Sequence, residues 1–299
     1  MRVRVIINPS AGRQAVQKNA GRILDNLLAD KTITLVDLIE TGQAGDACQA
    51  ARSYQPWDVD LLLAIGGDGT VNEVVNGMIS AGHNTPLAIL PAGTSNDFAY
   101  AMKIPRDING YCNMIRKFNT SQVDVGRIGS ACFLNVAAGG MLTDIPYKVS
   151  SETKTVLGQM AYILSGAIDL PAQLFQSFPV MLRSNEKTID DEILLFIAAN
   201  TRSVGGFRNF APKASVHDGR LDVLVIHKQN LFELVPLLLQ LVNGVHVSNP
   251  KVTYFQTDRL EVICRGVCPS VPLDLDGEAG PCLPAVIEVL PGAIRLVVE

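Results

Sequence analysis

The sequence is short of charge and has no basic run. Charged residues make up 18% of its 299 residues, and the net charge is −4. Because nucleic acid binding calls for clustered Lys and Arg, the composition argues against nucleic acid as a partner. Apolar residues reach 47%, which excludes wholesale disorder and is ample for hydrophobic cores.

Long apolar runs are missing as well. The longest, residues 231–242, is interrupted by Glu233, Pro236 and Gln240. It falls short of the ~20 residues that a spanning helix needs. The apolar run at the N-terminus is too short for a signal peptide and is broken at Asn8-Pro9. We therefore expect a soluble, cytoplasmic protein.

Cysteines are few and scattered. Of the six, Cys264 and Cys268 form the only close pair in sequence, with Cys282 further along. None of the four histidines is near enough in sequence to complete a metal site with them. We expect free thiols in a reducing compartment.

Two common glycine motifs are also absent. No G-x-G-x-x-G follows the first predicted strand, so a dinucleotide-binding Rossmann site is unsupported. No G-x-x-x-x-G-K-[ST] occurs anywhere in the chain, which excludes a P-loop NTPase.

The N-terminal part of the chain alternates between strand and helix patterns. At roughly 100–200 residues per domain, the length favours about two domains. Alternating strands and helices predict a parallel, doubly wound sheet. The predicted strands are 2–7, 32–38, 60–65 and 86–90, and the predicted helices are 14–28, 45–54, 71–81 and 95–102.

Strand patterns dominate the rest of the chain, which predicts a second, mostly antiparallel β-sandwich domain. We place the domains at 1–122 and 123–289, with residues 290–299 returning to the first. Helical patterns occur within 151–173 and 231–242. The predicted strands are 123–127, 132–137, 179–183, 192–199, 221–227, 260–264, 285–290 and 293–298.

The strongest chemical signal is the loop Gly66-Gly67-Asp68-Gly69-Thr70. It leaves a strand that is nearly all apolar and enters an amphipathic helix. Glycines let the backbone approach a ligand closely, and a helix N-terminus offers unpaired N–H groups to phosphate. Asp68 would place a carboxylate where Mg²⁺ or an attacking hydroxyl belongs. The alternative is an ordinary glycine turn capped by Asp or Thr.

Two companion loops favour the ligand interpretation. Asn8-Pro9-Ser10-Ala11-Gly12 follows the first predicted strand, and residues 91–97, Pro-Ala-Gly-Thr-Ser-Asn-Asp, follow the fourth. Loops at the carboxyl ends of parallel strands share one edge of the sheet, where ligands bind. Thr41, after the second strand, is expected at the same edge. Together the loops predict a nucleotide cleft.

These motifs resemble the catalytic domain of diacylglycerol kinases. The resemblance rests on Asn8-Pro9-x-Ala11-Gly12, the 66–70 loop with Asn72-Glu73, Gly93-Thr94-x-Asn96-Asp97-Phe98, and Asp276-Gly277-Glu278. It extends over nearly the whole chain, as in the soluble bacterial lipid kinases of this family. NAD kinases share the 66–70 motif, whereas the loop at 93–97 favours lipid kinases. The resemblance implies an ATP-dependent lipid kinase that forms phosphatidic acid.

The resemblance also implies roles for individual residues. Glu278 would be the general base, in a cleft between the domains, and Asp68 would act beside it. Asp68, Asp97 and Asp124 would surround catalytic Mg²⁺. On sequence alone, Asp-Gly-Glu is also a common exposed hairpin, and Asp124 a charge at a strand end. The implied nucleotide-binding residues are Asn8, Thr41, Gly66, Gly67, Asp68, Gly69, Thr70, Asn72 and Thr94.

A structural Mg²⁺ is implied in the second domain. Asp218 would supply its side chain, and Ser215 and Arg220 their backbone carbonyls, a donor set that suits a hard cation. Asp218-Gly219 is equally a simple turn signal.

The implied substrate is a lipid at a membrane surface, and relatives in this family form dimers, so a homodimer is one expectation. An apolar stretch beside Lys148 and Lys154 would be either a peripheral membrane contact or part of the second core. The apolar stretch comprises Met160, Tyr162, Ile163, Leu164, Ile168 and Leu170.

Other acceptors of the phosphoryl group remain open, namely a sphingoid base, phosphatidylglycerol or NAD. A nucleotide-binding regulator without catalytic activity also remains open.

Overall fold

The computed structural model divides the chain into two compact units. The first is Met1–Val123 with Gly292–Glu299, and the second is Asp124–Pro291. The structure describes residues 1–11, 14–140, 177–203, 209–230, 233, 236–237, 240–241, 244–266 and 271–299.

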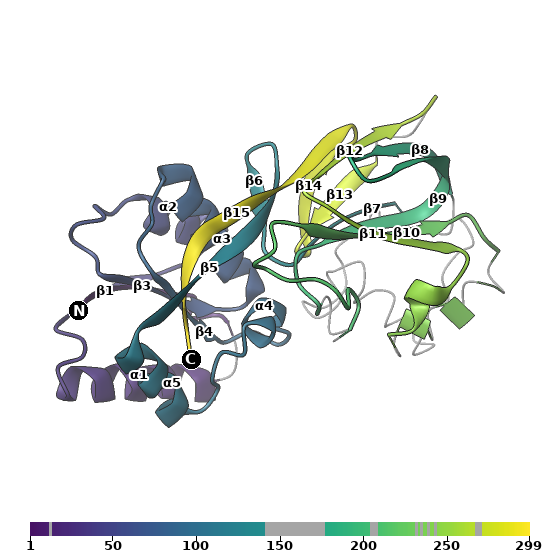
Figure 1. Cartoon of the computed structure of the whole chain (residues 1–299). Coiled ribbons are helices and arrows are strands. Elements are labelled where there is room, and N and C mark those ends of the chain that lie inside the picture. Colours follow the sequence, from purple (N-terminus) through teal and green to yellow (C-terminus); the bar gives the residue numbers. More distant parts are fainter. Residues whose placement is uncertain are drawn as a thin grey trace. The chain divides into compact units, whose positions relative to one another are not determined.

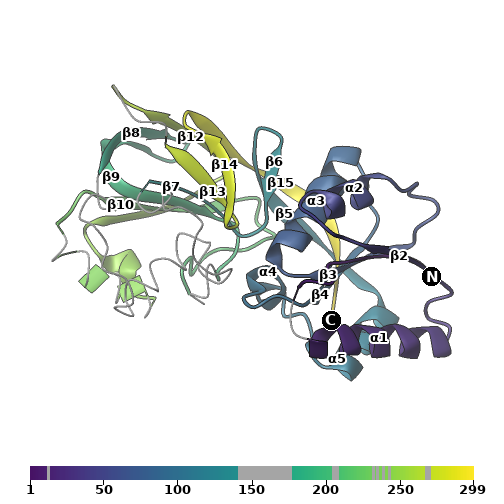
Figure 2. The same ribbon diagram turned by 180° about the vertical axis from the view of Figure 1, so that it is seen from behind.

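A parallel sheet forms the centre of the first unit. Its strands lie in the order β2-β1-β3-β4, and the last part of β15 (Ala285–Val298) lies beside β4. Helices α2 and α3 cover one face, and α1 and α5 cover the other (Figure 1, Figure 2). The bounds are β1 (Arg2–Ile7), α1 (Gln14–Ala29), β2 (Leu35–Glu40), α2 (Asp46–Arg52), β3 (Leu61–Gly66), α3 (Asp68–Ala81), β4 (Leu87–Pro91), α4 (Asp97–Ala101) and α5 (Ile108–Lys117).

Burial explains this arrangement. Every residue of β3 is buried, as expected of a central strand with helices on both faces of its sheet. The predicted doubly wound parallel sheet is therefore confirmed.

Two helices of this unit differ from the prediction. Helix α3 begins at Asp68 with Gly67 as its N-cap, three residues before the predicted start. The glycines hid this start because they weaken the helical pattern. Helix α5 was not predicted, although Asp107 caps it by accepting a hydrogen bond from the Gly110 N–H at 2.8 Å.

The second unit is built from antiparallel strands. Strand β9 pairs antiparallel with β7, β8 and β10, and the apolar residues form two buried clusters. The predicted β-sandwich is therefore confirmed. Strand β5 (Asn119–Ile128) begins in the first unit and continues into the second. The other bounds are β6 (Ala131–Phe133), β7 (Val136–Gly140), β8 (Phe178–Arg183), β9 (Thr188–Ala199), β10 (Leu221–His227), β11 (Val252–Thr257), β12 (Arg259–Cys264), β13 (Pro272–Leu275) and β14 (Glu278–Cys282), with a 3₁₀ turn at His246–Ser248.

Three further predictions about this part of the chain have different outcomes. Two strands were expected at 285–290 and 293–298, whereas the structure has one continuous strand, β15. Gly292 adopts a φ of +57° within it, and the strand continues on both sides of this residue. The expected helix within 151–173 lies outside the described residues. The expectation of six free thiols was wrong, because Cys264 is disulfide-bonded whereas Cys48, Cys112, Cys132 and Cys282 are free.

Candidate active site

The polar loops of the first unit meet at the carboxyl edge of its sheet. The Asn8 N–H donates to the Ile65 carbonyl at 2.9 Å, and the Ala92 N–H donates to the Gly66 carbonyl at 2.8 Å. The Thr41 N–H donates to the carbonyl of Ile7 at 2.9 Å. These bonds continue the strand pairing into the loops. The loops after β1, β2, β3 and β4 therefore lie next to one another, in the way expected from a parallel sheet.

The glycine loops after β3 and β4 touch through their backbones. A Cβ atom placed on Gly93 would lie 2.7 Å from the Gly67 Cα, closer than real Cβ contacts. Asn96 fixes this loop, because its Oδ1 accepts from the Gly93 N–H at 2.9 Å and its Nδ2 donates to the Gly93 carbonyl at 2.5 Å. The two motifs that predicted the site are thus held together by direct contact.

Thr70 occupies the space that Gly66 leaves. A Cβ on Gly66 would overlap the Thr70 side chain, which is buried in the first turn of α3. Asn8 Nδ2 donates to the Thr70 hydroxyl at 3.3 Å, and Asn8 Oδ1 accepts from the Ser10 N–H at 2.9 Å. Asn8 therefore links the loop after β1 to the start of α3.

The loop that follows Thr41 is fixed by two carboxylates. Asp46 accepts from the N–H groups of Gly42 and Gln43 at 2.8 and 3.0 Å, which lowers its pKa. Glu73, on α3, accepts from Gly45 and Ala47 at 2.9 and 3.1 Å. Glu73 thereby satisfies free N–H groups at the start of α2. The sequence placed Glu73 only within a motif and did not show this role.

The other predicted residues of this unit lie on the same loops and helices. Asp68 is in the first turn of α3 and Asp97 in the first turn of α4, where it is buried. Thr94 is exposed on the loop between Gly93 and Asn96. Asn72 Oδ1 accepts from Asn76 Nδ2 at 2.8 Å.

Glu278 begins β14, directly after a tight turn in the second unit. Asp276 and Gly277 adopt φ values of +53° and +89° in that turn, and Glu278 is exposed. The Asp276 carboxylate accepts three backbone N–H bonds, from Leu134 at 2.6 Å, Asn135 at 2.9 Å and Val136 at 2.8 Å. Asp276 thus joins the hairpin to the segment leading into β7. A rigid hairpin therefore presents Glu278.

A second carboxylate lies under the same turn. Asp274, on β13, is 5% exposed, and its Oδ1 accepts from the Gly277 N–H at 3.0 Å. Burial raises the pKa of Asp274 to about 7, and the charges of Asp276 and Glu278 add to the shift. Sequence reasoning did not identify Asp274, because its burial is a property of the folded hairpin.

Asp124 lies in the second unit beside the predicted cation loop. Its Oδ2 accepts from the Gly219 N–H at 2.8 Å, and its own N–H donates to the Val216 carbonyl at 2.8 Å. Within the loop, Asp218 Oδ1 accepts from the Arg220 N–H at 3.0 Å, and the Ser215 hydroxyl accepts from His217 at 3.3 Å. The loop is thus a turn held by its own side chains.

Neither predicted metal site is established by these contacts. Among the described residues, no group of three or more His, Cys, Asp or Glu side chains is arranged to hold a metal ion. The network of Asp68, Asp97 and Asp124 and the cation loop at 215–220 therefore stay predictions.

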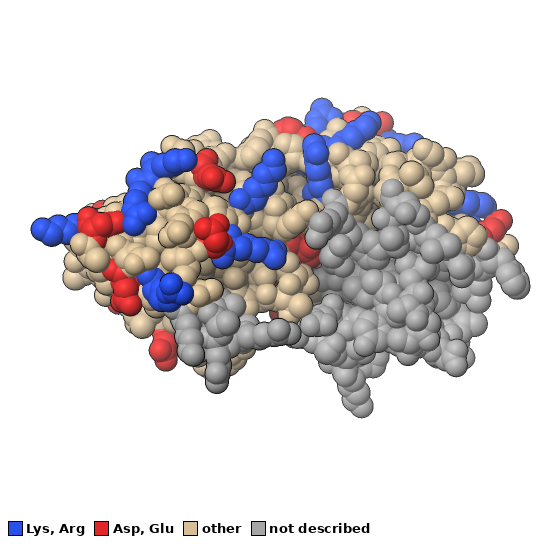
Figure 3. All heavy atoms as spheres, turned by 90° about the horizontal axis from the view of Figure 1, so that it is seen from below, with Lys and Arg blue, Asp and Glu red and all other residues tan. Residues whose placement is uncertain are grey.

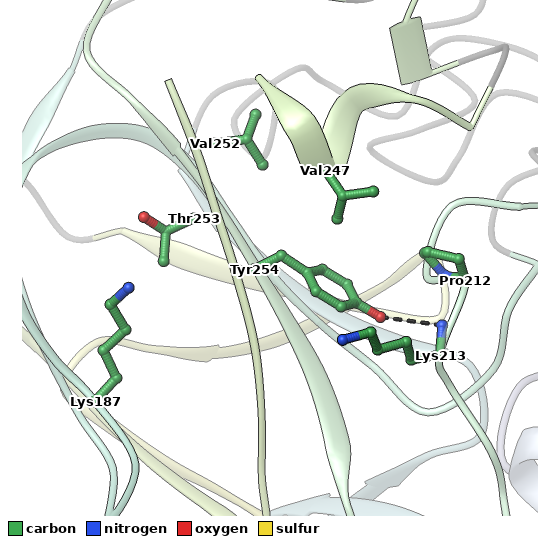
Figure 4. A pocket seen from close by; sticks show the side chains of 7 residues that line it. All are labelled: Lys187, Pro212, Lys213, Val247, Val252, Thr253 and Tyr254. Atoms are coloured by element: carbon green, nitrogen blue, oxygen red, sulfur yellow. Dashed lines mark hydrogen bonds between the residues drawn. The ribbon is translucent and has the colours of Figure 1, made fainter. Parts of the chain in front are cut away.

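A pocket of about 400 Å³ opens on the second unit, and none of its lining residues is a predicted site residue. Its lining combines apolar side chains with two lysines (Figure 4), and the hydroxyl of Tyr254 accepts from the Lys213 N–H at 3.2 Å. The lining residues are Lys187, Pro212, Lys213, Val247, Val252, Thr253 and Tyr254.

Within the described part of the chain, no helix is long and apolar enough to cross a membrane. Basic and acidic side chains both occur across the described surface of the face drawn in Figure 3. The apolar stretch expected to contact either a membrane or the core, at 160–170, lies outside the described residues.

Comparison with known proteins identifies the class of this fold and site. The family model described as the diacylglycerol kinase catalytic domain matches residues 2–128, and the model described as the YegS C-terminal NAD kinase beta sandwich-like domain matches residues 142–298. A crystal structure from Bacillus anthracis str. Sterne matches with a TM-score of 0.85 at 26% identity, covering 100% of this chain and 95% of that chain.

Curated relatives agree over almost the whole chain. The diacylglycerol kinase of Bacillus subtilis (strain 168) is 36% identical over 95% of this chain and 91% of its own length. That of Staphylococcus carnosus (strain TM300) is 33% identical over 95% of this chain and 90% of its own length. The chain therefore belongs to the diacylglycerol kinase family, and it is a lipid kinase with ATP as phosphoryl donor.

Proposed function

We propose that this lipid kinase transfers the γ-phosphoryl group of ATP to the hydroxyl of diacylglycerol, giving phosphatidic acid and ADP. The contact between the glycine loops at Gly67 and Gly93 supports this proposal most directly. It joins the motif shared with NAD kinases to the motif that distinguishes lipid kinases. Relatives named diacylglycerol kinase over nearly the same length support the choice of acceptor.

ATP would bind along the carboxyl edge of the first unit's sheet. The start of α3 supplies unpaired N–H groups and the positive end of a helix dipole, which suit phosphate oxygens. The close backbones at Gly67 and Gly93 leave no side chain between phosphate and main chain. The proposed contact residues are Asn8, Thr41, Gly66, Gly67, Asp68, Gly69, Thr70, Asn72 and Thr94.

Magnesium is part of the proposal. Asp68, Asp97 and Asp124 carry the carboxylate oxygens that Mg²⁺ prefers, and Asp68 and Asp97 directly follow the two touching loops. When bound, Mg²⁺ neutralises charge on the transferred phosphoryl group. In the second unit, Asp218 with the carbonyls of Ser215 and Arg220 would hold a structural Mg²⁺.

Glu278 is proposed as the general base. Asp68, in the first turn of α3, is proposed as a second catalytic residue at the ATP-binding site. The carboxylate of Glu278 takes the proton of the lipid hydroxyl, whose oxygen forms a bond to the γ-phosphorus. The bond from phosphorus to the bridging oxygen breaks, and ADP leaves with that electron pair. The exposed carboxylate on a rigid turn is suited to this task because it needs no rearrangement.

Glu278→Gln tests the base directly. The substitution keeps the side chain's size but removes its basicity, so phosphatidic acid formation should fall at least about 100-fold. ATP affinity, measured by calorimetry, should stay within about twofold. Glu261→Gln, which changes a partly exposed carboxylate on β12, is the matched control and should keep wild-type activity. A Glu278→Gln enzyme with wild-type turnover would overturn the assignment.

The acceptor is tested with radiolabelled ATP and a panel of hydroxyl compounds in mixed micelles. Diacylglycerol should be phosphorylated faster than sphingosine, phosphatidylglycerol or NAD. Preference for one of those would replace the proposed substrate. Lack of transfer to every acceptor would favour a nucleotide-binding regulator.

The proposed substrate determines where in the cell the reaction takes place. Diacylglycerol resides in membranes, so a protein made in the cytoplasm would meet it by peripheral contact with a membrane surface.

A homodimer is the oligomeric state proposed from the family resemblance. Sedimentation equilibrium would measure the oligomeric state.

A further inference from the structure

Asn200 is a fully buried amide that directly follows β9 in the second unit. Its Nδ2 donates to two backbone carbonyls, those of Asp124 and Leu134, each at 2.9 Å. Its own backbone N–H donates to the Asn135 carbonyl at 2.8 Å. Asn200 therefore ties the backbone of Asp124 to residues 134–136, a buried segment that leads from β6 into β7.

The same segment carries the hairpin of Glu278. Its three N–H groups all donate to the Asp276 carboxylate, and the Asp276 N–H donates to the Val136 carbonyl at 3.0 Å. The two remaining carbonyls of the segment accept from Asn200. All six backbone polar groups of residues 134–136 are thus satisfied by Asn200 and Asp276, which is a complete accounting for a buried segment.

The side chain at position 200 serves as a double donor. An amide nitrogen carries two N–H groups, one for each carbonyl, whereas a carboxylate of the same size carries none. The amide oxygen of Asn200 is buried and has no hydrogen-bond partner within the part of the chain that the structure describes. The contribution of this side chain to the site therefore comes from its two N–H groups.

We propose that Asn200 is a positioning residue that holds Asp124 and, through residues 134–136, the Glu278 hairpin in one fixed arrangement. The inference rests on the proposed roles of Asp124 at catalytic Mg²⁺ and of Glu278 as general base. Phosphoryl transfer depends on the positions of such groups, and a displacement of about 1 Å can cost about 100-fold in rate. Loss of one buried amide should therefore disturb both carboxylates together.

Each carboxylate also has a contact that fixes it beyond this shared support. Asp124 Oδ2 accepts from the Gly219 N–H at 2.8 Å. The turn before Glu278 is closed by the Gly277 N–H, which donates to Asp274 at 3.0 Å. These contacts fix the surroundings of each group separately, whereas Asn200 and Asp276 connect the two through the same three residues.

The first test replaces the double donor. Asn200→Asp keeps the size of the side chain but removes both N–H groups, and Asn200→Ala removes the polar group entirely. Both should lower kcat for diacylglycerol phosphorylation at least about tenfold and raise the Mg²⁺ concentration that gives half the maximal rate. Calorimetry without Mg²⁺ should show ATP affinity unchanged within about twofold, because the nucleotide loops lie in the first unit and keep their own bonds.

Leu182→Ala is the matched control for lost stability. Leu182 is fully buried on β8 of the same unit and takes part in none of these side-chain bonds. Its truncation should lower the Tm, as the Asn200 variants do, but leave kcat and the Mg²⁺ dependence as in the wild type. Wild-type kcat in Asn200→Ala would overturn the inference, as would an equal loss of kcat in Leu182→Ala.

A second measurement needs neither activity nor a substitution at position 200. In full-length Asp276→Asn, one amide oxygen replaces the two oxygens that accept from residues 134–136, so the segment should loosen. Hydrogen exchange at the Asn200 N–H should then be at least about tenfold faster than in Leu182→Ala. Unchanged exchange there would show that the segment is not a shared support. Failure of the proposed general base would appear separately, as activity retained by Glu278→Gln.

Discussion

The absence of a side chain at Gly93 allows the two nucleotide loops to pack against each other. Its contact with Gly67 leaves no room for a Cβ, while Asn96 closes the loop from the other side. Both glycines are visible in the sequence as phosphate-loop residues. The contact between them is not, because it depends on how two neighbouring strands end.

Gly93→Ala should separate these loops. The new Cβ would lie 2.7 Å from the Gly67 Cα, so the backbone must shift and the KM for ATP should rise roughly tenfold or more, by analogy with 1 Å displacements in active sites. Initial-rate kinetics at varied ATP measure this. Gly21→Ala is the control, since a Cβ there meets nothing within 4 Å, and alanine should stabilise α1 by about 0.5–1 kcal/mol. An unchanged KM would show that the contact is not required.

Asp274 should make stability depend on pH in an unusual direction. Its folded pKa of about 7 lies above the unfolded value of about 3.9, so the folded protein retains a proton that the unfolded chain has lost. Stability from this group is therefore fully present below about pH 4 and is lost as pH rises through 7. The loss is of order a few kcal/mol, at 1.36 kcal/mol per pKa unit.

Urea denaturation at several pH values measures this dependence. Asp274→Asn should flatten the fall in unfolding free energy between about pH 4 and 7, because asparagine does not titrate. Asp258→Asn, at an exposed position of the same unit, should keep the wild-type slope. Equal slopes in all three proteins would contradict the raised pKa.

At the scale of elements, α2 and α3 form one support for the loop that follows Thr41. Glu73 reaches from α3 to the first N–H groups of α2. The sequence predicted both helices from their apolar spacing. It did not reveal this link, because the bond joins residues 26 and 28 positions apart through folded geometry.

Glu73→Gln should loosen this link. Gln offers one acceptor oxygen where Glu offers two, so one N–H of α2 loses its partner at a cost of about 1–3 kcal/mol. We expect a lower Tm and a KM for ATP raised several-fold with kcat little changed. Asp25→Asn, exposed on α1, controls for loss of one charge. A Glu73→Gln protein with wild-type Tm and KM would show that the bonds are dispensable.

Element boundaries show what sequence patterns can and cannot locate. Strand β3 was predicted within a residue, because a buried parallel strand is a continuous apolar run. The start of α3 was predicted too late because its first turn contains Gly69, which has poor helix propensity. The unbroken course of β15 was missed because Gly292 and Pro291 resemble a turn.

At the scale of the whole molecule, the change in pattern near residue 120 was enough to predict a parallel sheet followed by a β-sandwich. Among the described residues, the alternation of strand and helix is confined to the first unit, so the change marks where that architecture stops. The burial of Asp274 was not predictable in this way, because it depends on which segments become neighbours in the fold.

Leu296 tests the dependence of the first unit on the end of the chain. It is fully buried and pairs with Leu87 of β4, so Leu296→Ala should destabilise the protein by about 2–5 kcal/mol. Leu38→Ala, which is 53% exposed on β2, is the matched control and should cost less than about 1 kcal/mol. Thermal unfolding with and without ATP separates the two variants. Equal losses would argue against β15 as a core strand of this unit.

The first unit is made of two separate segments of the chain, so its sheet can be completed only after the second unit has been synthesised. Residues 292–299 leave the ribosome only after all of 124–291 have been made, so β4 remains an unpaired sheet edge while the second unit is translated. Exposed edges invite aberrant pairing between nascent chains. We therefore expect nascent chains to need chaperones until residues 292–299 have been synthesised. A chain that stalls before this segment would carry its phosphate loops on a sheet that lacks the strand beside β4.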